Sequence, residues 1–208
     1  MRILIVSATE LEIAALQKRD DVERLVTGVG MVATAARTAS ALARTSYDLA
    51  LNLGICGSFD RALSPGTVVH VVSDGMPELG AEDGDRFLPI DELGLVKNDA
   101  PPFTNGWLVN RVVPENPVLQ ALPAVRGITV NTVHGNERSI AETVGRFDPQ
   151  VESMEGAGFM YACLLHDVPF AQVRAVSNFV ERRNRSAWKV DEAVANLCRV
   201  AQAMIEGA

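Results

Sequence analysis

Short apolar runs rich in β-branched residues are spaced along the whole chain. Runs of this length without regular polar alternation are typical of strands that are covered on both faces. Between them lie stretches in which small and apolar residues recur at helical spacing. The alternation of the two patterns predicts an α/β fold. The predicted strands are 3–6, 49–53, 68–72, 128–133 and 170–176, and the predicted helices are 10–18, 32–44, 136–144, 155–166 and 191–205.

Length and composition predict one domain over residues 1–208. The chain has 208 residues and 48% hydrophobic content, which is enough to bury one core of ordinary size. The segment 74–102 departs from the alternating pattern, because it is rich in glycine, proline and acidic residues. A loop this long inside a compact domain is usually functional or mobile. It reads as an insertion that forms a lid over a pocket.

Charge and cysteine usage narrow the classes of partner. The formal net charge of -7 argues against a nucleic-acid surface, which needs clustered Lys and Arg. No apolar run approaches the length of about 20 residues that crosses a bilayer, and the first residues predict a strand rather than a leader. The three cysteines are too few for a disulfide framework. We therefore expect a cytoplasmic protein with a small-molecule partner, no nucleic acid and no membrane.

The segments 151–158 and 169–178 are the most informative part of the sequence. The first joins a short acidic strand end to a helix, and the second is a buried apolar strand that ends in polar side chains. This arrangement places the carboxylate of Glu155 and the amide of Asn178 at one edge of the sheet, where open α/β folds bind their ligands. The sequence predicts a ligand site there.

Two motifs near the N-terminus have competing interpretations. Glu12 follows the first strand, where an acidic residue either caps the first helical turn or serves catalysis, and the two roles are weighted equally. The run 27–33 has the form G-x-G-x-x-A through Gly28 and Gly30. It is similar to a dinucleotide fingerprint but follows the wrong strand, so tight packing of strand against helix is the preferred interpretation.

Other candidates are weaker. Cys56 and Gly57 end a strand, and Cys56 lacks a histidine partner nearby, so a pocket-lining role is favoured over a nucleophilic one. The three histidines show no zinc-ligand spacing, so no metal is expected. Arginines in the run 181–188 either grip an anionic part of a ligand or belong to a solvated loop. They are Arg182, Arg183 and Arg185.

These motifs, taken in order, resemble the nucleoside phosphorylase and nucleosidase superfamily. The resemblance is carried by Glu12, the 27–30 turn, the 52–57 strand end and the segments 154–157 and 174–177. Within it, Ser177-Asn178 followed by 183–185 and Trp188 looks most like the futalosine hydrolases. Methylthioadenosine and S-adenosylhomocysteine nucleosidases and purine nucleoside phosphorylases are the alternatives. The resemblance implies a three-layer α/β/α domain with a mixed central sheet, a homo-oligomer, and no cofactor.

The resemblance also implies roles for side chains. Glu12 would accept a proton from the attacking water, Glu155 would bind the ribose hydroxyls, and Met154 would pack against the sugar. The substrate-binding set further includes Cys56, Gly57, Val133, His134, Arg185 and Trp188, with Arg185 among the arginines that would meet a carboxylate on the substrate tail.

Asn178 departs from the adenine-specific members of the superfamily, which carry Asp at the matching position. An amide donates N–H to N7 or to a 6-oxo group, and this favours hypoxanthine over adenine. Water is favoured over phosphate as the nucleophile because Glu12 would repel an anion. A phosphorylase remains an alternative, because Arg37 or an arginine of a neighbouring subunit could bind phosphate.

Overall fold

The structure is a computed structural model that describes residues 1–90 and 92–207. A mixed sheet of nine strands forms the centre of this described part, in the order β2-β1-β3-β10-β9-β4-β8-β7, and β11 pairs with both β3 and β4. The strands are β1 Ile3–Ser7, β2 Val22–Val26, β3 Leu49–Ser58, β4 Val68–Gly75, β7 Phe103–Thr104, β8 Trp107–Val109, β9 Ala124–Thr129, β10 Val151–Ser153 and β11 Phe170–Phe179.

Five of these strands close into a ring. β3 pairs parallel with β11, β11 antiparallel with β4, β4 parallel with β9, β9 parallel with β10, and β10 antiparallel with the end of β3. Each ring strand is therefore paired on both sides. A cluster of buried apolar residues forms a core of its own among these strands. The cluster consists of Cys56, Leu63, Val69, Val71, Val125, Val151 and Val176.

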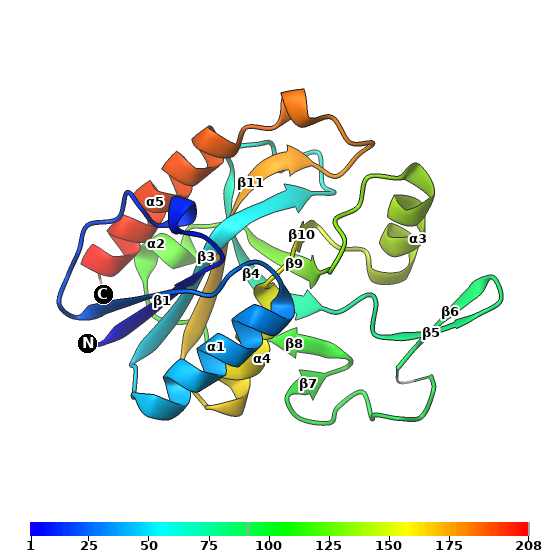
Figure 1. Cartoon of the computed structure of the whole chain (residues 1–208), viewed down its shortest axis with the longest axis horizontal. Helices are drawn as coiled ribbons and strands as arrows, with labels where there is room; N and C mark the ends of the chain where they lie inside the picture. The colour runs from blue at the N-terminus through cyan, green and yellow to red at the C-terminus, as the bar shows by residue number, and fades with distance from the viewer. Residues whose placement is uncertain (91, 208) are drawn as a thin grey trace.

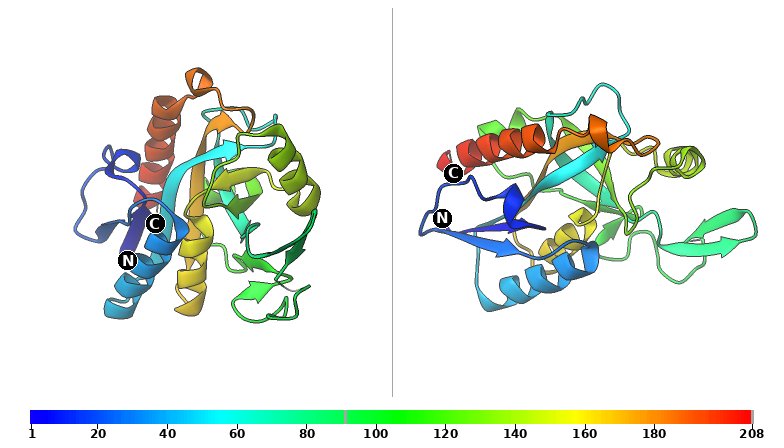
Figure 2. Two further views of the ribbon diagram at one scale, coloured as in Figure 1. Left: turned by 45° about the vertical axis from the view of Figure 1, so that its right-hand side comes forward. Right: turned by 45° about the horizontal axis from the view of Figure 1, so that its top comes forward.

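Helices cover both faces of the sheet, as Figures 1 and 2 show. α1 and α4 lie on one face, and α5 lies on the other beside the short α2. One core joins α5 to the sheet through Leu51, Leu53 and Leu197, and another joins α4 to it through Phe159 and Met160. The helices are α1 Met31–Arg44, α2 Pro117–Gln120, α3 Glu137–Phe147, α4 Gly156–Leu165 and α5 Val190–Glu206, with 3-10 turns η1 Glu10–Glu12 and η2 Arg185–Ala187.

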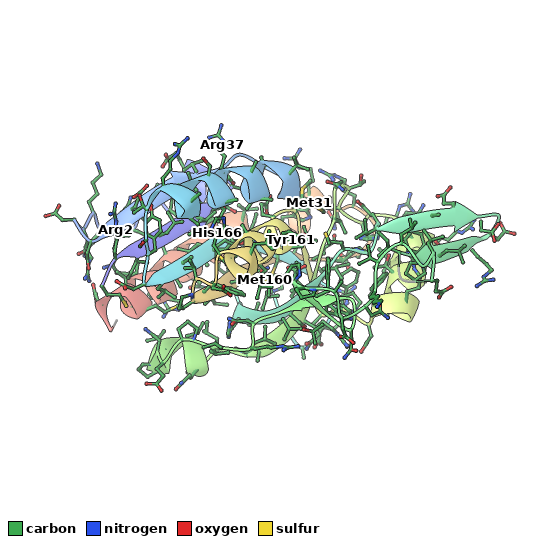
Figure 3. The ribbon with its side chains drawn as sticks, turned by 90° about the horizontal axis from the view of Figure 1, so that it is seen from below. Arg2, Met31, Arg37, Met160, Tyr161 and His166 are labelled. Atoms are coloured by element: carbon green, nitrogen blue, oxygen red, sulfur yellow. The ribbon has the colours of Figure 1, made fainter. Side chains whose placement is uncertain are left out.

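α4 is apolar on every side, and most of its residues are buried. Its sequence GAGFMYACLL contains no charged residue, and it packs on the sheet and against α1. A Cβ atom at Gly158 would collide with the carbonyl oxygen of Met31. Glycine at this position therefore lets the first turn of α1 lie directly on the first turn of α4, and Figure 3 shows the two helices side by side from below.

The predicted α/β fold with a mixed central sheet is confirmed, and the local differences have physical reasons. The predicted helix 10–18 is only the turn η1, and turns and irregular backbone over 13–21 lead from it to the short edge strand β2, which the apolar pattern did not predict. The predicted strand 128–133 is shifted to β9 Ala124–Thr129, and the exposed residues 131–133 form a loop. No helix in the described residues is long and apolar enough to span a membrane.

The predicted insertion 74–102 begins inside β4 and continues as a hairpin of β5 Gly80–Asp83 and β6 Arg86–Pro89. The hairpin extends away from the sheet in Figure 1. Phe103 and Trp107, which follow it, pack on the protein itself: Phe103 lies edge-to-face with Tyr161, and Trp107 with Phe147.

Candidate active site

Glu12 is a buried carboxylate that connects the ends of two strands. Its side chain follows β1 and accepts hydrogen bonds from the backbone N–H and the hydroxyl of Thr9, at 2.9 and 3.1 Å. Its other oxygen accepts from the backbone N–H of Ile55 in β3, at 3.2 Å. Glu12 therefore makes the local contacts expected of a cap and also reaches the strand end where a ligand site was predicted.

A second buried carboxylate, Glu155, immediately precedes α4. Its oxygens accept from the backbone N–H of Gly30 at 3.2 Å and from Nη1 of Arg174 at 3.4 Å. Arg174 is 1% exposed, and its Nη2 donates to Oδ1 of Asn52 at 2.5 Å. Residues of β3 and β11 therefore hold a guanidinium against the carboxylate of Glu155, which supplies the partner that a buried charge needs.

Gly54 shows that the two carboxylates face the same guanidinium. A Cβ atom at Gly54 would collide with Nη1 of Arg174 and would lie 3.1 Å from Oε1 of Glu12. Any side chain at position 54 is therefore excluded. The structure brings Glu12, Arg174 and Glu155 around this one point of β3.

The glycines of the 27–30 turn are required by its backbone conformation and not by close packing. Gly28 and Gly30 have φ values of +82° and +104°, and a Cβ atom at either would meet nothing within 4 Å. The interpretation of tight strand-to-helix packing is therefore wrong for these two residues. Their positive φ values favour glycine, and the resulting turn directs the N–H of Gly30 towards Glu155.

A buried polar network supports the start of α4. Asp74 accepts from the hydroxyl of Thr129 at 2.8 Å and from Nε2 of Gln172 at 3.0 Å, while the hydroxyl oxygen of Thr129 accepts from the N–H of Ala157 at 2.7 Å. Burial raises the pKa of Asp74 to about 6. A Cβ atom at Gly156 would collide with Asp74, so the peptide that carries Glu155 rests directly on this network.

A small cavity of about 50 Å³ opens beside the end of β3. It brings together five of the predicted residues, Gly57, Val133, His134, Asn178 and Trp188, and no described residue of 74–102 contributes to it. The amide of Asn178 is held by the hydroxyl of Ser177 at Oδ1 and donates from Nδ2 to the carbonyl of Phe179 at 2.9 Å. The remaining lining residues are Glu152, Phe179, Glu181, Arg183 and Asn184.

Three predicted residues lie elsewhere. The side chain of Cys56 belongs to the core within the strand ring, and burial raises the pKa of its thiol to about 12, so it remains a thiol at neutral pH. Arg185 is exposed in η2, and Arg183 lines the cavity in its place, with its guanidinium carbon 5.3 Å from the centre of the Trp188 ring. Met154 is half-buried and directly precedes Glu155.

Sequence reasoning assigned no role to Arg174 or Glu152. Both are almost fully buried, at 1% and 4% exposure. Charged residues are almost never buried without a partner, so the charge of Arg174 inside the predicted apolar strand 170–176 was an available signal. Glu152 lies in the three-residue strand β10 beside Ser153, where the sequence gives no such signal.

Comparison with known proteins shows the family of the chain. The family model of the phosphorylase superfamily matches residues 16–206. A futalosine hydrolase of Streptomyces coelicolor is 34% identical over 190 residues, which span 86% of this chain and 76% of the relative. A futalosine hydrolase of Acidothermus cellulolyticus is 36% identical over 187 residues, which span 83% of this chain and 70% of the relative.

Solved structures show the same fold. The futalosine hydrolase of Helicobacter pylori superposes with a TM-score of 0.79 at 13% identity, covering 100% of this chain and 98% of the other. A methylthioadenosine/S-adenosylhomocysteine nucleosidase from Colwellia psychrerythraea, in complex with adenine, has a TM-score of 0.79 at 20% identity and covers 100% and 95%. The chain therefore belongs to the phosphorylase superfamily and, within it, to the family of the futalosine hydrolases.

Proposed function

We propose that this protein hydrolyses the N-glycosidic bond of futalosine and releases hypoxanthine, as a step of menaquinone biosynthesis. The observation that carries the proposal is the arrangement of Glu12 and Glu155 around Arg174, at the same strand end that leads to the cavity beside Asn178. The names of the two futalosine hydrolases that share about a third of their residues with this chain support the substrate.

The two carboxylates fit the charges that develop in the reaction. Breaking the bond leaves positive charge on the ribose and sends an electron pair to the departing base. Glu12 takes a proton from the water molecule while the oxygen of that water attacks the anomeric carbon. Glu155 accepts hydrogen bonds from the ribose hydroxyls, and its negative charge stabilises the cationic sugar. Arg174 fixes the orientation of Glu155 from inside the protein.

Asn178 serves the departing base. Its N–H donates to N7 or to the 6-oxo group, where negative charge develops as the bond breaks. Trp188 closes the same cavity, and its apolar ring suits the face of a purine. Arg183 lines the cavity at the base end in this arrangement. We accordingly assign the tail of the substrate to the opposite, sugar-side end of the site.

Water suits this site better than phosphate. Arg174 is the buried arginine of the described residues, and its guanidinium is already occupied by Glu155 and Asn52. Glu12 and Glu155 would both repel a phosphate ion placed between them. Arg37, another candidate for binding phosphate, points outward from α1 in Figure 3 and is exposed.

We also propose that the protein works as a homo-oligomer. Leu11, Val29 and Val32 are exposed apolar residues, at 58%, 59% and 77%, in the segments that carry Glu12 and Gly30. A second copy that covers them would exclude water from the sugar side of the site. The continuous sheet supports a single domain over 1–208, and three buried free cysteines suit the reducing cytoplasm.

A chromatographic assay of base release tests the function. Futalosine, methylthioadenosine and inosine are each incubated with the protein, with and without inorganic phosphate. We expect hypoxanthine from futalosine at a rate that does not depend on phosphate, and slow cleavage of methylthioadenosine. Release that requires phosphate would identify a phosphorylase, and faster cleavage of methylthioadenosine would identify an adenine-nucleoside nucleosidase.

A further inference from the structure

Glu152 and Asn178 lie on either side of Gly57 in the sheet. Gly57 pairs with Glu152 of β10 in antiparallel register and with Asn178 of β11 on its other side. A Cβ atom at Gly57 would lie 3.4 Å from Nδ2 of Asn178 and 3.5 Å from Cγ of Glu152. Both side chains therefore project over the same face of Gly57, and both line the small cavity.

Glu152 is held in place by one residue, His134. Its Oε1 accepts from the backbone N–H of His134 at 3.0 Å, and its Oε2 lies 2.5 Å from Nδ1 of the same ring. Nε2 of His134 is 2.9 Å from the hydroxyl of Thr143 in α3. A carboxylate has about four lone-pair positions. Two are used by His134, so Glu152 retains the capacity to accept from a molecule in the cavity.

The backbone N–H of His134 is consequently occupied. The sequence placed His134 in the substrate-binding set, and a free backbone N–H at this wall of the cavity would suit an acceptor on a purine ring. Because that N–H donates to Glu152, the wall presents a carboxylate instead. The group that a base meets here is an acceptor of hydrogen bonds and not a donor.

We infer that Glu152 is a specificity-determining residue that accepts the N1–H of a 6-oxopurine, while Asn178 donates to its O6 or N7. The inference deepens the proposed function and rests on it, because it takes the cavity as the site of the base. Hypoxanthine carries a donor at N1 and acceptors at O6 and N7. Adenine carries an acceptor at N1, whose lone pair would face the negative charge of Glu152.

The closing experiment measures binding of free bases, which does not depend on turnover. Isothermal titration calorimetry gives the Kd values of hypoxanthine, adenine and unsubstituted purine for the wild type and for Glu152→Gln. We expect the wild type to prefer hypoxanthine. In Glu152→Gln the affinity for hypoxanthine should fall by about tenfold or more, because a charge-assisted hydrogen bond is lost, while the affinity for adenine should not fall.

Two further variants separate recognition from support of the loop. Thr143→Val removes the other partner of the His134 ring without touching the cavity, and Glu142→Gln, on the exposed face of α3, is the matched control for loss of a carboxylate. If Glu152 only holds His134, Glu152→Gln and Thr143→Val will lower the affinities for all three bases in parallel. That result, or an unchanged ratio of the affinities for hypoxanthine and adenine, overturns the inference.

Unsubstituted purine provides a test on the wild type alone, should Glu152→Gln fail to fold. It lacks both the N1–H and O6 and is smaller than hypoxanthine, so weak binding of purine reports the missing hydrogen-bonding groups and not a steric clash. Equal affinity for purine and hypoxanthine would contradict the inference. If futalosine is cleaved but the ratio of the affinities for hypoxanthine and adenine is the same in the wild type and in Glu152→Gln, only the inference is overturned. If hypoxanthine binding depends on Glu152 but futalosine is not cleaved, only the proposed function is overturned.

Discussion

The guanidinium of Arg174 lies 3.4 Å from the carboxylate of Glu155, with side-chain exposures of 1% and 8%. A buried ion pair of this kind contributes little net stability, since both charges lose their hydration. It fixes geometry instead. Nη2 of Arg174 also binds Asn52, and Gly30 holds the second oxygen of Glu155. Glu155 is therefore oriented from two sides before a sugar binds.

Replacing Arg174 by Gln should impair both folding and activity. The change leaves Glu155 as an uncompensated buried charge, and breaking one side of a buried pair costs about 3 to 5 kcal/mol. Urea unfolding measures this loss. The double variant Arg174→Gln/Glu155→Gln should recover part of the free energy of unfolding but no activity. Equal stability of the single and double variants would show that the two charges do not interact.

Glu12→Gln should abolish most of the turnover while the base still binds. The general base is lost, which lowers kcat by about 10²- to 10⁴-fold, and the Kd of hypoxanthine should remain within a few-fold of the wild type because the cavity beside Asn178 is untouched. Glu10→Gln, on the exposed side of the same turn η1, is the matched control and should retain full activity. A near-normal kcat for Glu12→Gln would remove Glu12 from the mechanism.

Gly30→Ala should weaken the site through its backbone. At φ +104° and ψ 150° a side chain is strained, at a cost of about 1 to 3 kcal/mol, and relief of that strain would turn the N–H away from Glu155. We expect a lower melting temperature and a higher KM. Gly145→Ala is the control: its Cβ would also meet nothing within 4 Å, but it lies in α3, where alanine is favoured. It should leave activity unchanged and slightly raise the melting temperature.

The buried carboxyl of Asp74 should give stability a pH dependence. Its pKa is raised by burial from 3.8 to about 6, so between these values the folded protein binds more protons than the unfolded chain. The free energy of unfolding contributed by Asp74 therefore falls as pH rises from about 4 to 6, by about 3 kcal/mol in total.

Comparison with Asp74→Asn isolates this contribution. His70, whose pKa is lowered by burial to about 4, contributes the opposite slope over much of the same range, so the wild-type profile alone is not diagnostic. Urea unfolding of both proteins at pH 4, 5, 6 and 7 gives the difference. As pH rises, the free energy of unfolding of the wild type should fall relative to that of Asp74→Asn. A difference that is constant with pH would show that Asp74 does not titrate in this range.

The fold class followed from the sequence because its signal is repeated along the chain. Continuous apolar strands such as 49–53 and 170–176 and long helices such as 32–44 and 191–205 were predicted close to their observed positions. The strands that were not predicted, β2, β5, β6, β7 and β8, are short, and short strands carry too few residues for a periodic pattern to emerge.

Glu155 and Asn178 were predicted to lie together because each follows the end of a predicted strand. Glu12 and the cavity residues Val133, His134 and Trp188 were assigned from the resemblance to the superfamily. Glu152 and Arg174 were not predicted as site residues, because their interactions are with residues distant in sequence, His134 and Glu155 respectively. Cys56 was placed in the pocket because it ends a predicted strand. The sequence does not show which face of the strand its side chain occupies, and in the structure the side chain points into the core within the ring.

The closed ring divides the proposed site into two parts. Gly57, Glu152 and Asn178 lie on ring strands that are each paired with a neighbouring strand on both sides. Glu12 and the Gly30 turn belong to the margin formed by β1, β2 and α1, which lies outside the ring. We expect adaptation to substrates with different tails to occur in this margin, while the choice of base stays constant.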